Sequence, residues 1–380
     1  MAKNKFYETK KTPKTLLIGI HAPYNRTSFI ASYFEEFLNL VKTAAIPYDQ
    51  MIIIKLREID SAYFFTKGKL EEVKKICQDN SIEQVILSDR LSPQQARNLE
   101  DFFDVTIIDR TDLILDIFEK AAFSAEGKTQ VEIARLQHEK SRLAGKGIFM
   151  EQQAGITGLR GGFGEKAKER ERRYLDQQIR NLEREIKVIQ KSRATQRKQR
   201  ISRKVPHVCL IGYTNAGKST ILNALTKSDV LAEDKLFATL DTTTRALFID
   251  GKQKGIISDT VGFIQQLPHH LIEAFKSTLS ELEYAHLLMQ VIDISDPNWE
   301  SHIEVVQTIL DELDLSHKPM LFVFNKVDKV DDTEKYSARL SRYQPHVIVS
   351  ALSPNGLKPL LEFLRNWKLE IIESPRVEEN

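Results

Sequence analysis

The stretch CLIGYTNAGKSTILNAL, residues 209–225, joins a short apolar run to a glycine-bounded turn and then to a helical pattern. The turn from Gly212 to Ser219 has the order glycine, four residues, glycine, lysine, serine that is typical of a P-loop. In such a loop backbone N–H groups curl around phosphate oxygens, and the N-terminus of the next helix adds positive potential. We therefore predict a nucleoside triphosphate site in an α/β fold; a glycine turn that only starts a helix is the alternative.

The charged and hydroxyl residues near this turn have distinct expected roles. Lys218 would reach the β and γ phosphates, and the Ser219 hydroxyl would bind Mg²⁺. A second motif, SDTVG, follows another apolar run, so that Asp259 could bind the metal through water and the Gly262 N–H could meet the γ-phosphate. The two motifs predict a Mg²⁺-dependent phosphate site with Lys218 and Gly262 as candidate catalytic residues.

The segments NKVD, residues 325–328, and SAL, residues 350–352, indicate which base is bound. The Asp328 carboxylate offers two acceptors, which pair with the N1–H and 2-amino donors of guanine, whereas adenine has an acceptor at N1 and no 2-amino group. The Ala351 N–H is expected near guanine O6. The sequence therefore predicts GTP rather than ATP.

Residues 1–125 are expected to form an N-terminal α/β domain. Four apolar runs between residues 15 and 110 predict buried strands, and the segments between them have 3.6-residue periodicity. This alternation predicts βαβ units and a small parallel sheet. The segment TKGKLEEV at 66–73 predicts a helix start, and ATP binding there is the alternative.

Residues 126–204 are expected to form a helical hairpin or linker. One long or broken helix leads into a glycine-rich segment, residues 145–164, and a second helix follows from Glu165. Apolar residues of this second helix are spaced 4, 3, 4 and 3 apart, namely Leu175, Ile179, Leu182, Ile186 and Ile189. The spacing is typical of a coiled-coil seam. We predict that the preceding helix covers the seam in an antiparallel hairpin, with a homodimer as the alternative.

The alternation of strands and helices returns at residues 205–370, the expected GTP-binding domain with a mostly parallel sheet, and residues 371–380 are a short tail. No apolar run approaches the roughly 20 residues that span a bilayer, and the N-terminus lacks the apolar core of a signal peptide. We therefore expect a cytoplasmic protein. Cys77 and Cys209 lie outside any paired metal spacing, so neither zinc nor disulfides are expected.

The net charge of the chain is only +2, but the charge is unevenly distributed. Residues 165–204 contain fifteen Lys or Arg and six Asp or Glu, so the rest of the chain is acidic. A basic helix is often a solvated face; this one is also typical of a surface that binds nucleic acid phosphates.

These motifs, in this order, resemble those of the translation-factor-related class of P-loop GTPases. Three further segments resemble the HflX family of ribosome-associated GTPases: residues 109–137, LFATLDTTTR at 236–245, and residues 259–285. The resemblance covers nearly the whole chain. It implies that Thr239 is the switch threonine, whose hydroxyl and carbonyl engage Mg²⁺ and the γ-phosphate in the GTP state. Thr239 thus joins Ser219 and Asp259 as a candidate metal ligand and Lys218 as a candidate catalytic residue; an ordinary strand-edge hydroxyl is the alternative.

The P-loop, the segment LFATLDTTTR at 236–245, here called the switch segment, SDTVG and the two base-recognition segments together form the expected nucleotide site. Its expected residues are Gly212, Tyr213, Thr214, Asn215, Ala216, Gly217, Lys218, Ser219, Thr220, Phe237, Ala238, Thr239, Leu240, Asp241, Asp259, Thr260, Val261, Gly262, Asn325, Lys326, Asp328, Ser350, Ala351 and Leu352. Asn215 matches the asparagine of GTPases that use K⁺ to neutralise charge. K⁺ is thus a possible second cofactor, with a loop-stabilising hydrogen bond as the alternative.

The sequence departs from the family pattern at several places. The glycine segment ends in LRGGFGE, residues 159–165, where the family usually has Gly-Pro-Gly-Glu, and the family's DPTTR is DTTTR here. Some members of the family continue past the GTPase domain with a further small domain. Only 28 residues follow Leu352 here, so we expect that domain to be absent. Phe263 follows the SDTVG glycine where many GTPases have a water-orienting glutamine. A phenyl ring makes no such hydrogen bond, so slow intrinsic hydrolysis is expected.

The resemblance implies a GTPase that converts GTP to GDP and phosphate and binds the large ribosomal subunit, through ribosomal RNA, in its GTP form. It also implies that stalled or idle ribosomes are separated into subunits. Because intrinsic hydrolysis is expected to be slow, we expect the ribosome to stimulate it, and we expect the protein to be monomeric. Two alternatives stay open: a coiled-coil GTPase switch that acts on a membrane or signalling partner, and a switch in small-RNA metabolism.

Overall fold

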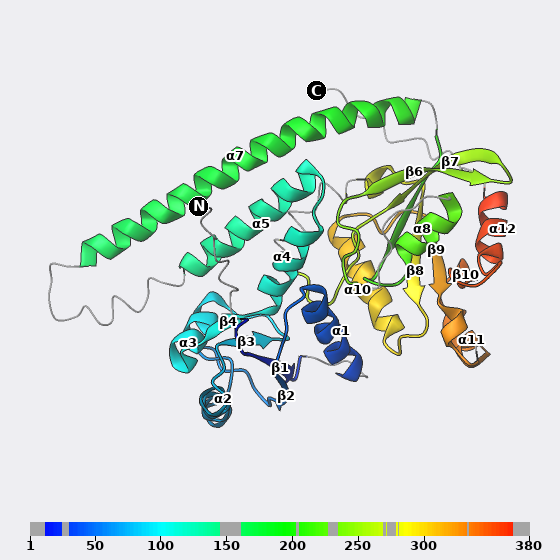
Figure 1. Ribbon diagram of the computed structural model, residues 1–380. Helices are drawn as coiled ribbons and strands as arrows, with labels where there is room; N and C mark the ends of the chain where they lie inside the picture. Colours follow the sequence, from blue (N-terminus) through cyan, green and yellow to red (C-terminus); the bar gives the residue numbers. More distant parts are fainter. Residues whose placement is uncertain are drawn as a thin grey trace, which may run out of the picture. The chain divides into compact units, whose positions relative to one another are not determined.

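The computed structural model describes residues 12–24, 30–144, 161–202, 205–226, 235–268, 271, 279, 281–332 and 334–367 (Figure 1). Contacts between residues divide the chain into two compact units. The first unit consists of Met1–Lys120 and Lys128–Glu185, and the second of Ala121–Gly127 and Ile186–Asn380. The short segment Ala121–Gly127 therefore belongs with the C-terminal part of the chain, although it lies far upstream in sequence.

The first unit contains a four-stranded parallel sheet (Figure 1). Its strands are β1 (Thr15–His21), β2 (Gln50–Lys55), β3 (Gln84–Leu87) and β4 (Thr106–Ile108), in the order β2-β1-β3-β4. The central strand β1 is buried along almost its whole length, as expected for an apolar run with helices on both faces. The predicted small parallel sheet is confirmed.

Helices cover both faces of this sheet. They are α1 (Ile30–Thr43), α2 (Lys67–Asp79), α3 (Pro93–Phe103) and α4 (Arg110–Ala121). Alternate residues of β1 point to opposite faces: Leu16 and Ile18 belong to the core that contains residues of α2 and α3, whereas Gly19 faces Phe34 of α1. The segment at 66–73 is a helix start, with Thr66 as the N-cap residue of α2.

The predicted long or broken helix is broken, because α4 ends at Ala121 and α5 spans Ala125–Ala144. Asp109 caps α4: its Oδ1 accepts from the Asp112 N–H at 2.9 Å, and Asp112 Oδ2 accepts from the Asp109 N–H at 3.1 Å. On α5, His138 and Arg142 bond the two oxygens of Asp112 at 2.9 and 2.7 Å. The two Asp residues and His138 lie close enough to suggest a metal site, but hydrogen bonds already engage these carboxylate oxygens, so the cluster is a structural cap.

Helix α7 (Gly161–Ser202) is the second arm of the predicted hairpin. Leu175 and Ile179 are buried, and Lys140 near the end of α5 forms an ion pair of 2.5 Å with Asp176 in the first half of α7. A contact between these two positions requires an antiparallel arrangement, which Figure 1 shows for the described residues. The predicted hairpin is therefore confirmed.

The start of α7 differs from the prediction. We expected the loop to extend to residue 164, but the helix begins at Gly161 and includes three glycines of LRGGFG. A glycine in a helix costs up to about 1 kcal/mol relative to alanine. Residues 165–202 already form 38 residues of helix, and the glycines before them extend this helix in spite of that cost. The remainder of the glycine segment, residues 145–160, lies outside the described residues.

The second unit contains a six-stranded sheet. Its strands are β5 (His207–Gly212), β6 (Thr243–Ile249), β7 (Lys252–Asp259), β8 (Leu287–Asp293), β9 (Met320–Asn325) and β10 (His346–Ile348), in the order β10-β9-β8-β5-β7-β6. Only β6 is antiparallel to its neighbour, because a tight turn joins it to β7. The predicted mostly parallel sheet is confirmed.

Helices of the second unit cover both faces of this sheet (Figure 1). They are α8 (Lys218–Thr226), α10 (Trp299–Glu312), α11 (Ser337–Leu340) and α12 (Lys358–Asn366), with short 3₁₀ turns η2 (Leu282–Tyr284), η3 (Val327–Lys329) and η4 (Glu334–Tyr336). On β5, Leu210 packs in the core of α8 and α12, whereas Ile211 packs in the core of α10. Since β5, β8 and β9 are parallel and central, their carboxyl ends share one edge, where ligands of open α/β sheets bind.

No helix in the described part of the chain is long and apolar enough to cross a membrane. Cys77 and Cys209 are both buried free thiols. The division into segments 1–125, 126–204, 205–370 and 371–380 stays a prediction.

Candidate nucleotide site

The P-loop leaves β5 at Gly212 and enters α8 at Lys218. Gly217 has φ +97°, and a Cβ atom there would lie 2.3 Å from Asn325 Nδ2, so this position requires glycine. Asn215 also has a positive φ, +59°, which asparagine tolerates better than most residues. The strand, the left-handed turn and the helix start therefore give this loop the shape that its sequence predicts.

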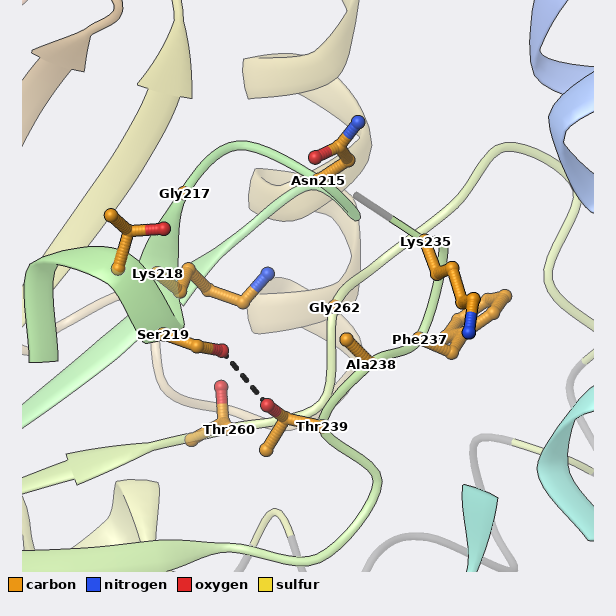
Figure 2. A pocket seen from close by; sticks show the side chains of 11 residues that line it. Asn215, Gly217, Lys218, Ser219, Lys235, Phe237, Ala238, Thr239, Thr260 and Gly262 are labelled. Atoms are coloured by element: carbon orange, nitrogen blue, oxygen red, sulfur yellow. Dashed lines mark hydrogen bonds between the residues drawn. The ribbon is translucent and has the colours of Figure 1, made fainter. Parts of the chain in front are cut away.

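A pocket opens at this loop (Figure 2). It is lined by Asn215, Gly217, Lys218, Ser219, Thr220, Lys235, Phe237, Ala238, Thr239, Thr260 and Gly262. All of these residues except Lys235 were predicted from the sequence. The pocket combines the start of α8 with residues of the switch segment and of SDTVG.

Three predicted metal ligands converge beside the pocket. Ser219 Oγ lies 2.8 Å from Thr239 Oγ1 and donates to Asp259 Oδ2 at 2.6 Å, and Thr239 Oγ1 donates to the same carboxylate oxygen at 3.2 Å (Figure 2 draws the Ser219–Thr239 bond). Asp259 is fully buried, and its second oxygen, Oδ1, has no hydrogen-bond partner. A buried acceptor without a donor fits a hard cation or its water shell, so this group of oxygens suits Mg²⁺.

Lys218 is buried, and its Nζ donates to the carbonyl oxygens of Gly212 at 3.1 Å and Tyr213 at 2.8 Å. Burial lowers the pKa of Lys218 to about 8, although the nearby Asp259 charge opposes this shift. Burial likewise raises the pKa of Asp259, against the charge of Lys218. The charged forms of Lys218 and Asp259 are therefore poorly solvated. A bound phosphate would supply a counter-charge to Lys218, and a bound metal would supply one to Asp259.

The base-recognition segments lie at the ends of β9 and β10. Asn325 Nδ2 donates to the Ala216 carbonyl at 2.9 Å, and its Oδ1 accepts from the Ala351 N–H at 3.0 Å. Asn325 thus ties the P-loop to the SAL loop. The Ala351 N–H is already engaged, so a contact with guanine O6 would have to share or replace this bond, and that contact stays a prediction.

The remaining polar residues of these segments are also held by neighbours. Asp328 Oδ1 accepts a hydrogen bond from the Ser350 hydroxyl, which orients the exposed carboxylate. Lys326 pairs with Asp293 at 2.7 Å. Leu352 is 79% exposed, and among the described residues no hydrogen bond joins it to Asn325 or Asp328. The structure thus presents the Asp328 carboxylate to solvent, with one of its oxygens held by Ser350.

Several predicted residues do not line the pocket. They are Gly212, Tyr213, Thr214, Ala216, Leu240, Asp241, Asp259, Val261 and the base-recognition residues. Tyr213 stacks on His302 with ring centroids 3.8 Å apart, and its hydroxyl accepts from the Gln265 N–H at 2.8 Å. Tyr213 therefore supports the segment after SDTVG.

Phe263 packs away from the pocket. Its side chain is 2% exposed and belongs to the apolar core under α10, while its N–H and carbonyl bond to Gly212 and Thr214. The side chain anchors the segment after SDTVG to the core. No water-orienting hydrogen bond can come from this position.

Lys235 is the pocket residue that sequence reasoning missed. It lies four residues before Thr239, and Figure 2 shows its side chain beside Phe237 at the rim of the pocket. Its position directly before LFATLDTTTR, in which residues 237–241 were predicted to contact nucleotide, was the available signal. A second cation near the phosphates adds positive potential to that of Lys218.

Three family models match the chain in succession. They are described as GTP-binding GTPase N-terminal, residues 31–119, GTP-binding GTPase Middle Region, residues 121–200, and 50S ribosome-binding GTPase, residues 207–326. A GTPase HflX of Magnetococcus marinus is 39% identical over 359 residues, which are 94% of this chain and 83% of the relative. The chain belongs to the HflX family of GTPases.

Other HflX proteins are similar to the same extent. The one of Escherichia coli is 40% identical over 87% of this chain and 78% of its own length, and the one of Caldanaerobacter subterraneus is 42% identical over 86% and 76%. A GTP-binding protein of Sulfolobus solfataricus, solved with GDP, is 26% identical over 93% of this chain and 97% of its own, with a TM-score of 0.45. The HflX relatives carry the family assignment, and with it the conclusion that the protein is a GTPase.

Proposed function

We propose that this HflX protein binds the large ribosomal subunit in its GTP form and separates stalled or idle ribosomes into subunits. The observation that carries this proposal is the match of residues 207–326 to a family model described as 50S ribosome-binding GTPase. A protein with this partner works in the cytoplasm, and we propose that it acts as a monomer.

The charge of α7 supports a partner rich in phosphate. From Lys187 to Lys204 the sequence has eight Lys or Arg and no Asp or Glu. Such a segment binds RNA by neutralising backbone phosphates and releasing their counterions. The apolar seam of the same helix is buried at Leu175 and Ile179, so these positions are not free for a signalling partner or a second copy.

The nucleotide site supports a switch controlled by GTP. Ser219, Thr239 and Asp259 would hold Mg²⁺ directly or through water, and the metal would neutralise charge on the phosphates. Thr239 would sense the γ-phosphate, because its hydroxyl already lies within hydrogen-bond distance of Ser219. Lys218 and the Gly262 N–H would orient the phosphates, and Asn215 at the rim would hold K⁺.

Slow hydrolysis by the chain alone is part of this proposal. With Phe263 packed in the core, no side chain at that position orients the attacking water. The ribosome would then stimulate hydrolysis by ordering the switch segments or by supplying a polar group. Such an arrangement keeps the GTP form long enough to find its partner.

The proposal is tested by GTP hydrolysis at fixed salt with and without purified large subunits. We expect subunits to raise the rate at least about ten-fold, well within what an ordered catalytic group supplies, with Lys218→Ala as the inactive control. Sedimentation of 70S ribosomes with the protein and a non-hydrolysable GTP analogue should then yield free subunits, whereas GDP should not.

Small subunits and free small RNA serve as the comparison. A rate that rises equally with small RNA would favour the role in small-RNA metabolism. A rate unchanged by large subunits, or co-sedimentation that ignores the nucleotide, would contradict the proposal.

A further inference from the structure

Asp241 follows the switch threonine by two residues, but its side chain is engaged far away in sequence. Its Oδ2 accepts from the N–H groups of Phe123 and Ser124 at 3.0 and 2.8 Å, and its Oδ1 accepts from the Ser124 hydroxyl. All of these residues belong to the second unit. Three donors on one carboxylate make this an ordered contact rather than a chance surface pair.

The segment that Asp241 contacts is the N-terminal cap of α5. Ser124 precedes the helix, and its Oγ accepts from the Gly127 N–H at 2.9 Å, as an N-cap serine does. In a capping box, a Glu or Gln three residues after the N-cap would bind the N-cap N–H in return. Helix α3 has this local arrangement, with Gln95 Oε1 accepting from the Ser92 N–H at 2.9 Å.

Helix α5 lacks that local partner, because the third residue after Ser124 is Gly127. Asp241 supplies the missing carboxylate from the switch segment. A Cβ atom on Gly127 would lie 2.4 Å from Asp241 Oδ1, so the glycine leaves the space that the foreign carboxylate occupies. The Asp241 carboxylate thus lies in the space that a side chain at Gly127 would fill.

The Asp241 carboxylate is connected to the nucleotide site through one buried residue. Between Asp241 and Thr239 lies Leu240, which is 1% exposed and therefore fixed in the core. Thr239 in turn bonds Ser219 and Asp259. The cap of α5 and the predicted metal ligands are therefore separated by a short and buried stretch of backbone.

We infer that Asp241 is a positioning residue. It completes the cap of α5 and thereby holds Thr239 at the nucleotide site. The binding of GTP at that site therefore also affects the start of α5. Helix α5 begins in the second unit and continues from Lys128 in the first, so the cap lies where the chain passes between the two. The inference rests on the proposed role of Thr239 in the GTP state. It does not depend on the ribosome.

The main test compares Asp241→Ala with Thr239→Ala and with Asp250→Ala. The last variant removes a carboxylate in the turn after β6, which pairs with Arg365 instead of with α5. Affinities for GDP and for a non-hydrolysable GTP analogue are measured on the full chain. We expect Asp241→Ala to weaken analogue binding about ten-fold, a typical coupling between sites, and to leave GDP binding within about two-fold. Hydrogen exchange at residues 125–132 should be faster in this variant, and Asp250→Ala should change neither quantity.

A double variant separates positioning from simple support of the helix. Gly127→Glu in the Asp241→Ala background restores a local capping box, because the added side chain no longer meets the Asp241 carboxylate. We expect slow exchange at α5 to return while the weak analogue binding persists. If analogue binding recovered as well, Asp241 would only support the helix, and the inference would be wrong.

Two further outcomes are decisive. If Thr239→Ala left the preference for the GTP analogue intact, the proposed role of Thr239 would fail. If Thr239→Ala abolished that preference but Asp241→Ala did not, the inference on Asp241 alone would fail. Should Asp241→Ala not fold, Ser124→Ala is the second variant. It removes two bonds of the same cap, the one that the hydroxyl donates to Asp241 and the one that it accepts from the Gly127 N–H, and is expected to act in the same direction. Unchanged analogue binding in this variant would also overturn the inference.

Discussion

At the scale of the single residue, the charge of Lys218 predicts how nucleotide binding depends on pH. Burial lowers its pKa to about 8, and bound phosphates would raise this pKa again. Binding above pH 8 must then take up a proton, so affinity falls as the pH rises. We expect the Kd for GTP to increase about ten-fold between pH 7 and 9, with proton uptake detectable by calorimetry in buffers of different ionisation enthalpy.

Lys218→Gln is the control for this pH dependence, because it removes the lysine that titrates. The guanine base of GTP also loses a proton at high pH, and its effect on binding is still present in this variant. Its weaker affinity should be nearly constant between pH 7 and 9. A wild-type protein with constant affinity and no proton uptake would show that Lys218 stays fully charged in the free state.

Asp328 predicts base specificity at the same scale. Asp328→Asn keeps the acceptor for the Ser350 hydroxyl but turns an NH₂ group toward the donors of guanine. We expect GTP affinity to fall about ten- to hundred-fold, the value of a charge-assisted hydrogen bond, and xanthosine triphosphate binding to improve. Asp331→Asn, also exposed and three residues away, is the matched control. Undiminished use of GTP by the Asp328 variant would remove the guanine assignment.

The sequence predicted most of the site residues, because each motif fixes a local structure and the order of motifs fixes which strand ends meet. Ser219, Thr239 and Asp259 come together for this reason. The partner of Asp241 could not be predicted, because it lies 117 residues upstream and only the tertiary fold joins the two. The bond between Asn325 and the Ala351 N–H was missed for the same reason.

At the scale of the element, apolar runs and 3.6-residue periodicity located nearly every described strand and helix, whereas the helix ends were predicted less accurately. The glycines at the start of α7 show why. Residue preference alone predicts a loop there, but a long helix can absorb a few unfavourable residues at its end. The break between α4 and α5 had no proline or glycine to mark it, and the cap at Ser124 determines where α5 starts.

The seam between α5 and α7 predicts the effect of truncating its side chains. Leu175 is 4% exposed, so Leu175→Ala should lower the free energy of unfolding by about 2 to 4 kcal/mol through lost burial and the resulting cavity. Its neighbour Tyr174 is 60% exposed, and Tyr174→Ala should cost far less. Denaturant unfolding followed by circular dichroism measures both. If Leu175→Ala instead changed the oligomeric state in sedimentation, the homodimeric alternative would apply.

At the scale of the whole molecule, the uneven charge predicts how binding to the large subunit depends on salt. Eight Lys or Arg lie between residues 187 and 204, six of them in α7, whereas the total charge of the chain is only +2. We therefore expect attraction to RNA to be concentrated on this part of the chain. Lys187→Gln combined with Lys191→Gln removes two exposed charges from it. If both contact phosphates, the slope of log affinity against log salt should become shallower by about two.

Lys67→Gln combined with Lys75→Gln removes the same charge from exposed positions of α2 and separates a local effect from one of net charge. This pair should leave the salt slope nearly unchanged, since most of the attraction comes from contacts within a Debye length of about 8 Å at physiological salt. Subunit binding measured between 50 and 300 mM KCl, with the GTP analogue present, compares the two pairs. Equal loss of slope in both would mean that net charge alone governs binding and that α7 does not lie on the RNA.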